Sequence, residues 1–205
     1  MPEPPHRKRA RKFDIAGHAH FLTFSCYQRL PLLTNDAWRT MLATSIRTAC
    51  DKYRIALWAY VFMPEHVHLL LKPRCESYRL ASFEQSMKTS SAMSILNALK
   101  QEKSPLLEKL IVQERPGRWI YRFWQEGGGH DLNIWTMKKA IEKAEYCHNN
   151  PVKRRLVPSA DRWRWSSFRW LVQGMREGEP LRVDDWSEML EGEPVDAERA
   201  HRDRH

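Results

Sequence analysis

The chain has 205 residues, 42% of them hydrophobic, which is enough for one domain with a buried core. No run approaches the roughly 18 to 20 apolar residues that a membrane span needs, and the N-terminus lacks the apolar segment of a secretory signal. We therefore expect a cytoplasmic protein without a membrane contact. The four cysteines form no C-x-x-C pair, which argues against a zinc ribbon or a thioredoxin-like site.

Charge is unevenly distributed along the chain. The net charge is +9, but the segment from Glu177 to Glu198 holds nine acidic residues and one basic residue. The rest of the chain therefore carries +17. A body this basic favours a polyanionic partner, with nucleic acid as the default candidate, whereas the alternative is a solvated basic surface with no partner.

Composition divides the chain into three parts. Residues 1–12 are a Pro-rich and then basic arm, residues 13–173 carry the patterns of a folded domain, and residues 174–205 are an acidic tail that we expect to be loosely attached. Five residues of the arm are candidates for phosphate contacts: Arg7, Lys8, Arg9, Arg11 and Lys12.

The first half of the domain predicts three strands and one helix. The aromatic segment 20–27 is typical of a strand, and apolar residues at helical spacing predict a helix over 36–53, capped by Thr34 or Asn35. A second strand is expected over 55–62. A connection of three residues containing Pro64 then leads into a third strand over 66–71, so these two strands should form an antiparallel hairpin.

The second half predicts two further helices and a last strand. A Ser-rich helix is expected over 83–101, and the segment 119–125 reads as a strand. Gly127 to Gly129 are either a tight connection, a hinge or a point of close backbone approach. A helix capped by Thr136 should end near Asn149, because proline follows at 151. This order predicts an α+β, ferredoxin-like fold with an antiparallel sheet and helices on one face.

His66 and His68 stand two residues apart in the third strand, within the sequence MPEHVHLLL. Alternate side chains of a strand share a face, so both imidazoles point one way while Val67, Leu69 and Leu71 point to the other. With Cβ atoms about 6 to 7 Å apart, the two rings can converge on one cation. The alternative is a pair of surface histidines at a sheet edge, which the apolar flanks make harder to justify.

A second candidate group lies in the sequence MKKAIEKAEYCHNN of the last helix. Tyr146 and Asn150 are four residues apart and therefore share one face of that helix. An ordinary half-buried tyrosine and a helix-end asparagine are the alternative interpretations. The surrounding basic residues would supply positive charge: Lys139, Lys143, Lys153, Arg154 and Arg155.

Together, MPEHVHLLL and AEYCHNNPVKRRLV resemble the single-tyrosine HUH transposases of the IS200-like superfamily, and most nearly the REP-associated tyrosine transposases. The resemblance extends to FWQEGGGHDLNI and WRWSSFRW and covers about residues 13–171. One departure is His130, where relatives often have tyrosine. The signature Tyr-x-His-x-Asn-Pro-Val of these transposases is matched by Tyr146, His148, Asn150, Pro151 and Val152.

The resemblance implies an HUH endonuclease fold and a chemistry. Tyr146 would be the nucleophile, and His66, His68 and Asn150 would hold a divalent cation, Mg²⁺ or Mn²⁺. The substrate would be single-stranded DNA beside a palindromic hairpin, cut and rejoined through a covalent 5′-phosphotyrosine. Relatives include domain-exchanging dimers and forms that act alone, so a monomer or a homodimer is expected. The protein is also expected to be associated with the nucleoid.

Two other functions are compatible with the same residues. A non-catalytic DNA-hairpin-binding protein would keep the fold without turnover, and a zinc-dependent hydrolase would use the histidines without a covalent adduct. Four tryptophans are candidates for stacking on unpaired bases, with core packing as the alternative: Trp124, Trp135, Trp163 and Trp165.

Overall fold

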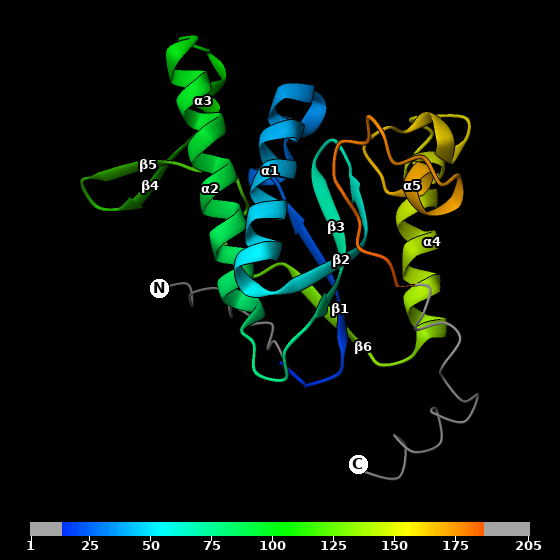
Figure 1. Ribbon diagram of the computed structural model, residues 1–205. Helices are drawn as coiled ribbons and strands as arrows, with labels where there is room; N and C mark the ends of the chain where they lie inside the picture. Colours follow the sequence, from blue (N-terminus) through cyan, green and yellow to red (C-terminus); the bar gives the residue numbers. More distant parts are fainter. Residues whose placement is uncertain (1–13, 187–205) are drawn as a thin grey trace, which may run out of the picture.

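The computed structural model describes residues 14–186, so the basic arm 1–12 and the end of the acidic tail lie outside the described residues. None of the helices in this range is long and apolar enough to cross a membrane. In chain order the elements are β1 (Ala19–Ser25), α1 (Asp36–Tyr53), β2 (Ile55–Phe62), β3 (His66–Pro73), α2 (Leu80–Gln101), α3 (Leu106–Leu110), β4 (Ile111–Arg115), β5 (Arg118–Tyr121), β6 (His130–Ile134), α4 (Met137–Lys153) and α5 (Phe168–Val172) (Figure 1).

Four strands form one antiparallel sheet in the order β2-β3-β1-β6. With α1 and α2 as the two crossover helices, this is the ferredoxin-like arrangement. The predicted α+β class is therefore confirmed. The register places His68 opposite Thr23 of β1 on one side and Val61 of β2 on the other.

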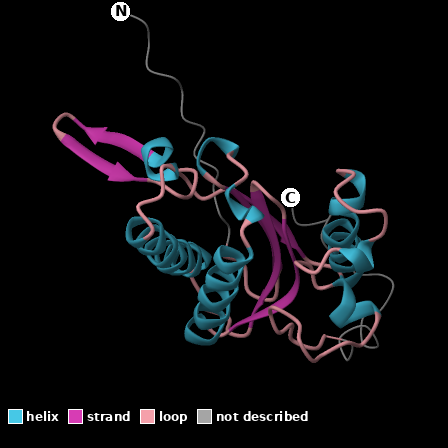
Figure 2. Cartoon of the chain, turned by 90° about the horizontal axis from the view of Figure 1, so that it is seen from above, coloured by secondary structure: helices cyan, strands magenta, loops and turns pink. Residues whose placement is uncertain are grey.

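Helices cover both faces of the sheet, as Figure 2 shows. The helices α1 and α2 pack on the face of Val67 and Leu69, whereas α4 packs on the opposite face, against Val61 and Leu70. The prediction of helices on one face is thus right for α1 and α2 and wrong for α4. The reason is that β2 and β3 are buried along nearly their whole length, so both faces need cover.

The strand predicted over 119–125 is divided between two places. Its first residues form β5, which pairs with β4 in a separate two-stranded ribbon. Its last residues lie beside the end of β1, where Trp124 and Cys26 form an isolated antiparallel bridge. The fourth strand of the main sheet is β6, which follows the glycines and was not predicted. At Gly129, where φ is +65°, a Cβ would overlap the carbonyl oxygen of Thr23, so glycine lets the chain approach β1 closely here.

Helix α4 begins as predicted at Thr136, whose side chain accepts a hydrogen bond from the Lys139 N–H. It does not end near Asn149 but continues through Pro151 to Lys153. Proline removes one backbone donor, yet the Arg154 N–H still donates to the Asn150 carbonyl at 3.0 Å, so the last turn stays closed. Asn150 consequently lies inside the helix.

Segments that follow α4 cover the free edge of β2. The Trp165 carbonyl accepts from a β2 N–H at 2.8 Å, and the Ser167 N–H donates back to the strand at 3.0 Å. Further along, the Asp184 N–H donates to the Leu57 carbonyl at 2.8 Å. The expected loose attachment after Gly174 is therefore wrong for residues 174–186, where three apolar side chains are buried: Leu181, Val183 and Trp186.

Candidate active site

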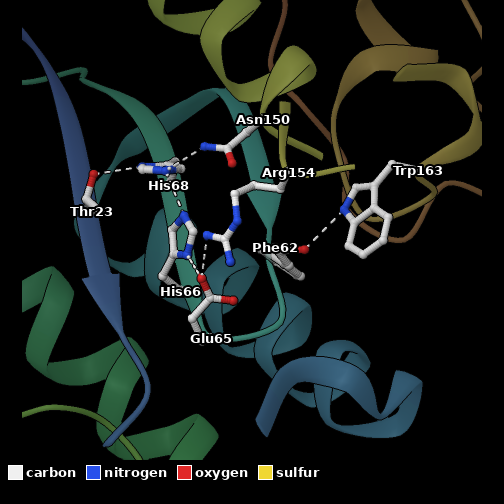
Figure 3. A network of polar contacts seen from close by, with 8 residues as sticks. All are labelled: Thr23, Phe62, Glu65, His66, His68, Asn150, Arg154 and Trp163. Atoms are coloured by element: carbon white, nitrogen blue, oxygen red, sulfur yellow. Dashed lines mark hydrogen bonds and ion pairs between the residues drawn. The ribbon is translucent and has the colours of Figure 1, made fainter. Parts of the chain in front are cut away.

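His66 and His68 lie on the sheet face that α4 covers, and both side chains are buried. Their Nε2 atoms are 3.0 Å apart (Figure 3). The opposite nitrogen of each ring has its own partner. Nδ1 of His66 lies 3.0 Å from Glu65 Oε1, and Nδ1 of His68 lies 2.7 Å from Thr23 Oγ1. Each imidazole is thus held in orientation from behind.

These outer contacts fix where the ring protons lie. A carboxylate only accepts, so His66 Nδ1 donates to Glu65 and its Nε2 presents a lone pair. The Asn150 amide donates to His68 Nε2 at 3.2 Å, so this nitrogen also presents a lone pair and Nδ1 donates to Thr23. Burial lowers the pKa of His66, and it lowers the pKa of His68 to about 3, with further lowering from His66 and Lys143. Two neutral rings therefore turn lone pairs toward each other.

This donor set fits a divalent cation. Two ligands at about 2.1 Å from an ion, at right angles to each other, are separated by about 3.0 Å, which matches the distance between the two Nε2 atoms. Asn150 reaches the same point from α4, and a half-turn of its amide would present Oδ1 as a third ligand. Within residues 14–186, no group of three or more His, Cys, Asp and Glu side chains could hold a metal ion. A metal site with three protein ligands at this position therefore requires the side-chain amide of Asn150.

Tyr146 lies on α4 directly beside His68. The two ring centroids are 5.3 Å apart and the rings are nearly perpendicular. Phe21 stacks on His68 at 5.3 Å and meets the edge of Tyr146 at 5.9 Å, which holds the two rings together from the β1 side. The tyrosine is 40% exposed, so a macromolecular substrate can reach it from solvent.

The predicted basic residues have different surroundings. The ammonium groups of Lys143 and Lys153 lie 5.9 and 5.5 Å from the Tyr146 ring centroid, so they place positive charge at the tyrosine. The side chain of Arg154 is half exposed, and its Nη1 donates to Glu65 at 2.8 Å. Lys139 pairs with Glu142, and Arg155 is exposed. The candidates of the arm lie outside the described residues: Arg7, Lys8, Arg9, Arg11 and Lys12.

Two further histidines lie nearby. His148 is buried, its Nε2 lies 3.0 Å from Ser167 Oγ, and burial lowers its pKa to about 4. It joins α4 to the segment that covers β2, rather than contacting the histidine pair. His130 is exposed on β6 and lies opposite Thr23 in the register.

Two supporting residues were missed by the sequence analysis. Glu65 stands in the connection between two strands, and its position next to His66 is a usable signal, since histidines that bind metals commonly donate their other N–H to a carboxylate. Thr23 gave no local signal, because it reaches His68 only through strand pairing.

The four candidate tryptophans for stacking differ in exposure. Trp124 and Trp165 are core residues, 6% and 5% exposed. Trp163 is half-buried and donates to the Phe62 carbonyl at 3.1 Å (Figure 3). Trp135 is open to solvent at 43%. Core packing is thus what the structure has for the first two.

The family of IS200-like transposases matches residues 15–126, more than half of the chain, and the chain belongs to that family. Membership implies a DNA-processing activity and confirms the resemblance seen in the sequence. The matched region contains His66 and His68 and ends before Tyr146.

The chain is also similar to a solved structure described as a REP-associated tyrosine transposase bound to a REP hairpin. The two share 21% identity and superpose with a TM-score of 0.63 over 88% of this chain and 95% of that one, which shows a common fold. A putative transposase from Deinococcus radiodurans R1 gives 19% identity and a TM-score of 0.42, over 69% of this chain and 96% of its own. No curated protein matches the chain significantly.

Proposed function

We propose that the chain is a metal-assisted single-strand DNA endonuclease and strand transferase that uses Tyr146 as its nucleophile. The observation that carries this proposal is the contact between the Tyr146 and His68 rings at 5.3 Å. It joins a solvent-accessible phenol on α4 to the paired imidazoles on β3. A tyrosine in an ordinary packing role would not need two lysines around it and a buried histidine pair beneath it.

Cleavage would exchange one phosphate ester for another. The Tyr146 oxygen attacks the scissile phosphorus, a tyrosyl 5′-phosphodiester forms, and the bond to the 3′ oxygen breaks. The phenol proton passes to water, and the released 3′ oxygen takes a proton to become a hydroxyl. In rejoining, a 3′-hydroxyl attacks the phosphotyrosine and expels Tyr146. The ester keeps the energy of the original bond, so no nucleotide hydrolysis is required.

His66, His68 and Asn150 would hold the divalent cation, Mg²⁺ or Mn²⁺. When bound, that ion supplies Lewis-acid polarisation of a non-bridging phosphate oxygen. The residues of the chain do the rest. Phe21 and α4 orient the Tyr146 ring, and Lys143 and Lys153 attract the phosphate to it through their charge.

The proposed substrate is single-stranded DNA next to a palindromic hairpin. The similar fold of a transposase described with a REP hairpin supports this choice, as does the basic charge of the body outside residues 177–198. A non-catalytic hairpin-binding protein on the same fold is the second candidate, because the basic charge of the body would attract a DNA hairpin whether or not Tyr146 reacts.

The test is a search for a covalent protein–DNA adduct. A hairpin with a single-stranded flank carries a label at its 3′ end, so that the fragment joined to tyrosine is the labelled one. With Mg²⁺ or Mn²⁺ the wild type should retain label on the protein in a denaturing gel, and EDTA should abolish it. Tyr146→Phe should give no labelled protein, whereas Tyr53→Phe, on the far side of the sheet in α1, should behave as wild type.

Each outcome separates the candidates. A labelled adduct with Tyr146→Phe would show that the nucleophile assignment is wrong. Cleavage without any adduct in the wild type would identify a hydrolase that uses the same histidines. Tight hairpin binding with neither cleavage nor adduct would identify the non-catalytic alternative.

A further inference from the structure

Glu65 is a buried carboxylate that contacts two parts of the site at once. Glu65 as a whole is 8% exposed. One oxygen, Oε1, accepts from His66 Nδ1 at 3.0 Å and from Arg154 Nη1 at 2.8 Å (Figure 3). The backbone at this position is fixed as well, because the Glu65 carbonyl accepts from the Cys26 N–H at 2.9 Å. The carboxylate therefore extends from a rigid point of the hairpin between β2 and β3.

The two partners of Glu65 belong to the two halves of the site. His66 is on β3, whereas Arg154 caps the C-terminus of α4, the helix that carries Tyr146 and Asn150. Contacts of one oxygen with both groups are charge-assisted and stronger than neutral hydrogen bonds. The same oxygen, Glu65 Oε1, therefore accepts the proton of the His66 imidazole and contacts the C-terminal end of α4.

The carboxylate also decides which nitrogen of His66 is free. With Glu65 present, the proton is held on Nδ1 and the Nε2 lone pair faces His68. Without it, a neutral imidazole can place its proton on Nε2 and donate to His68 Nε2 across the same 3.0 Å. The two histidines would then satisfy each other, and their nitrogens would no longer be open to a cation.

We propose that Glu65 and Arg154 are positioning residues that assemble the site. Glu65 keeps the Nε2 atom of His66 available as a ligand, and the ion pair with Arg154 holds the end of α4 against β3. This inference rests on the proposed function and deepens it. It also gives Arg154 a role other than the phosphate contact expected from its charge.

The test measures Mn²⁺ affinity directly, through the EPR signal of free Mn²⁺ in the absence of DNA. Glu65→Ala should weaken Mn²⁺ binding about 10- to 100-fold, the usual effect of removing an outer partner of a ligand. Glu65→Gln, which keeps an acceptor but loses the charge, should fall between it and wild type. Asp51→Ala removes an exposed carboxylate that pairs with Arg47 on α1, and it should bind Mn²⁺ like wild type.

Arg154 is tested by its coupling to Glu65. Arg154→Met should lower the rate of adduct formation at saturating Mn²⁺ more than it raises the DNA concentration for half-maximal rate, because the seating of α4 is affected rather than DNA capture. Arg154→Lys should restore part of the rate. The double variant, Arg154→Met with Glu65→Ala, should form the adduct only slightly more slowly than the slower of the two single variants, since both changes break the same contact between Glu65 and Arg154.

Mn²⁺ affinity within about twofold of wild type in folded Glu65→Ala would overturn the inference, as would additive losses in the double variant. Lower thermal stability with unchanged Mn²⁺ affinity would show a purely structural role and would overturn it too. These results are distinct from failure of the proposed function, because Tyr146→Phe should bind Mn²⁺ like wild type whether or not adducts form.

A second, independent observation concerns the ribbon formed by β4 and β5. It projects from the body beside α2 and α3 in both views (Figures 1 and 2). Residues opposite each other in the pairing share a face, so Trp119 and Tyr121 lie on one face with Gln113 and Ile111. Trp119 is 63% exposed, Ile111 41% and Tyr121 38%. We call this set the aromatic face of the ribbon.

Cations border the aromatic face. The Lys100 ammonium lies 5.1 Å from the Tyr121 ring centroid, and Arg115 is exposed at the ribbon tip. Exposed aromatic rings next to cations are the chemistry with which proteins bind single-stranded nucleic acid, since bases stack on the rings while the cations contact phosphates. A two-stranded ribbon is only marginally stable alone, so large exposed rings on it need another reason than packing.

The geometry points to the aromatic face as a docking surface for unpaired bases of single-stranded DNA. The measurement is fluorescence anisotropy with a labelled hairpin that carries a single-stranded flank and with the same hairpin without the flank. Trp119→Ala should raise Kd for the flanked hairpin at least about fivefold, as expected for the loss of one stacked base. Trp119→Phe should recover most of the affinity. Val172→Ala, a similarly exposed apolar residue on α5, is the control.

Comparison of the two DNAs distinguishes base stacking from other effects of the substitution. Trp119→Ala should lose affinity for the flanked hairpin and lose little affinity for the hairpin without a flank. Equal Kd values for wild type and Trp119→Ala on the flanked hairpin would overturn the proposal, and so would equal losses on both DNAs. A wild-type dimer that Trp119→Ala converts to a monomer would instead identify the face as a contact between copies.

Discussion

Two neutral imidazoles that turn lone pairs toward each other inside a protein are unfavourable unless a group between them, such as a cation, accepts both lone pairs. In this chain the arrangement is enforced from behind, by Glu65 on one ring and Thr23 on the other. Asn150 adds a third polar group from a different element. At the scale of single residues, the site is therefore recognisable less by the histidines than by the partners that fix their protons.

Cysteine reactivity gives a prediction at this scale. Burial raises the pKa of Cys26 and of Cys50 to about 12, and that of Cys147 well above its ordinary value, so their thiolates are negligible at pH 8. Cys75 is only half-buried. A thiol titration of the native protein at pH 8 should show one fast thiol, lost in Cys75→Ser, and denaturant should release all four. A second fast thiol would contradict this burial.

The sequence predicts those parts of the site that depend on spacing within one element. His66 and His68 share a face because strands alternate, and Tyr146 and Asn150 share one because helices repeat near every fourth residue. The contact of Glu65 with Arg154 spans 89 residues, and that of Thr23 with His68 spans 45. No local pattern records such contacts, since they exist only once the sheet and α4 have packed.

At the scale of elements, strong hydrophobic periodicity and helix caps predicted the bounds correctly, whereas the rule that a proline ends a helix did not. The bounds of α1 and β2 agree with the prediction. Pro151 did not end α4, because a proline in the last turn removes a donor without preventing the next bond. β6 is short and partly exposed, so its own sequence favours a strand weakly; it is stabilised by pairing with β1.

The glycines before β6 provide the prediction for this scale. Gly129→Ala would force a Cβ into the Thr23 carbonyl oxygen at a backbone φ of +65°, so we expect a loss of at least about 3 kcal/mol in unfolding free energy. Gly127→Ala, at φ +98° with nothing near its Cβ, carries only the conformational strain of about 1 to 2 kcal/mol. Urea unfolding compares them, and equal losses would exclude the close approach.

At the scale of the molecule, the sheet is a middle layer with α1 and α2 on one side and α4 on the other (Figure 2). The fold class followed from the order of elements. The second helical layer did not, although the continuous apolar run of β2 is the pattern of a strand covered on both faces. The burial of the segment after Gly174 was not apparent from the sequence for another reason. Its charge is conspicuous, while the few apolar residues that attach it are scattered.

Removing that segment tests its contribution. A chain ending at residue 173 should be less stable than one ending at residue 186 by at least about 3 kcal/mol, since it loses the buried side chains of Leu181, Val183 and Trp186. Thermal or urea unfolding of the two chains gives the difference directly. Equal stability would mean that these residues add nothing to the domain.

Helix α4 packs on the sheet of its own chain, so Tyr146 meets the histidines of the same polypeptide. Under the proposed function, a mixture of a His66→Ala chain and a Tyr146→Phe chain should show no intermolecular complementation, even at concentrations where chains associate. Restored adduct formation in the mixture would mean that helices are exchanged between copies, and that each cut is shared by two molecules.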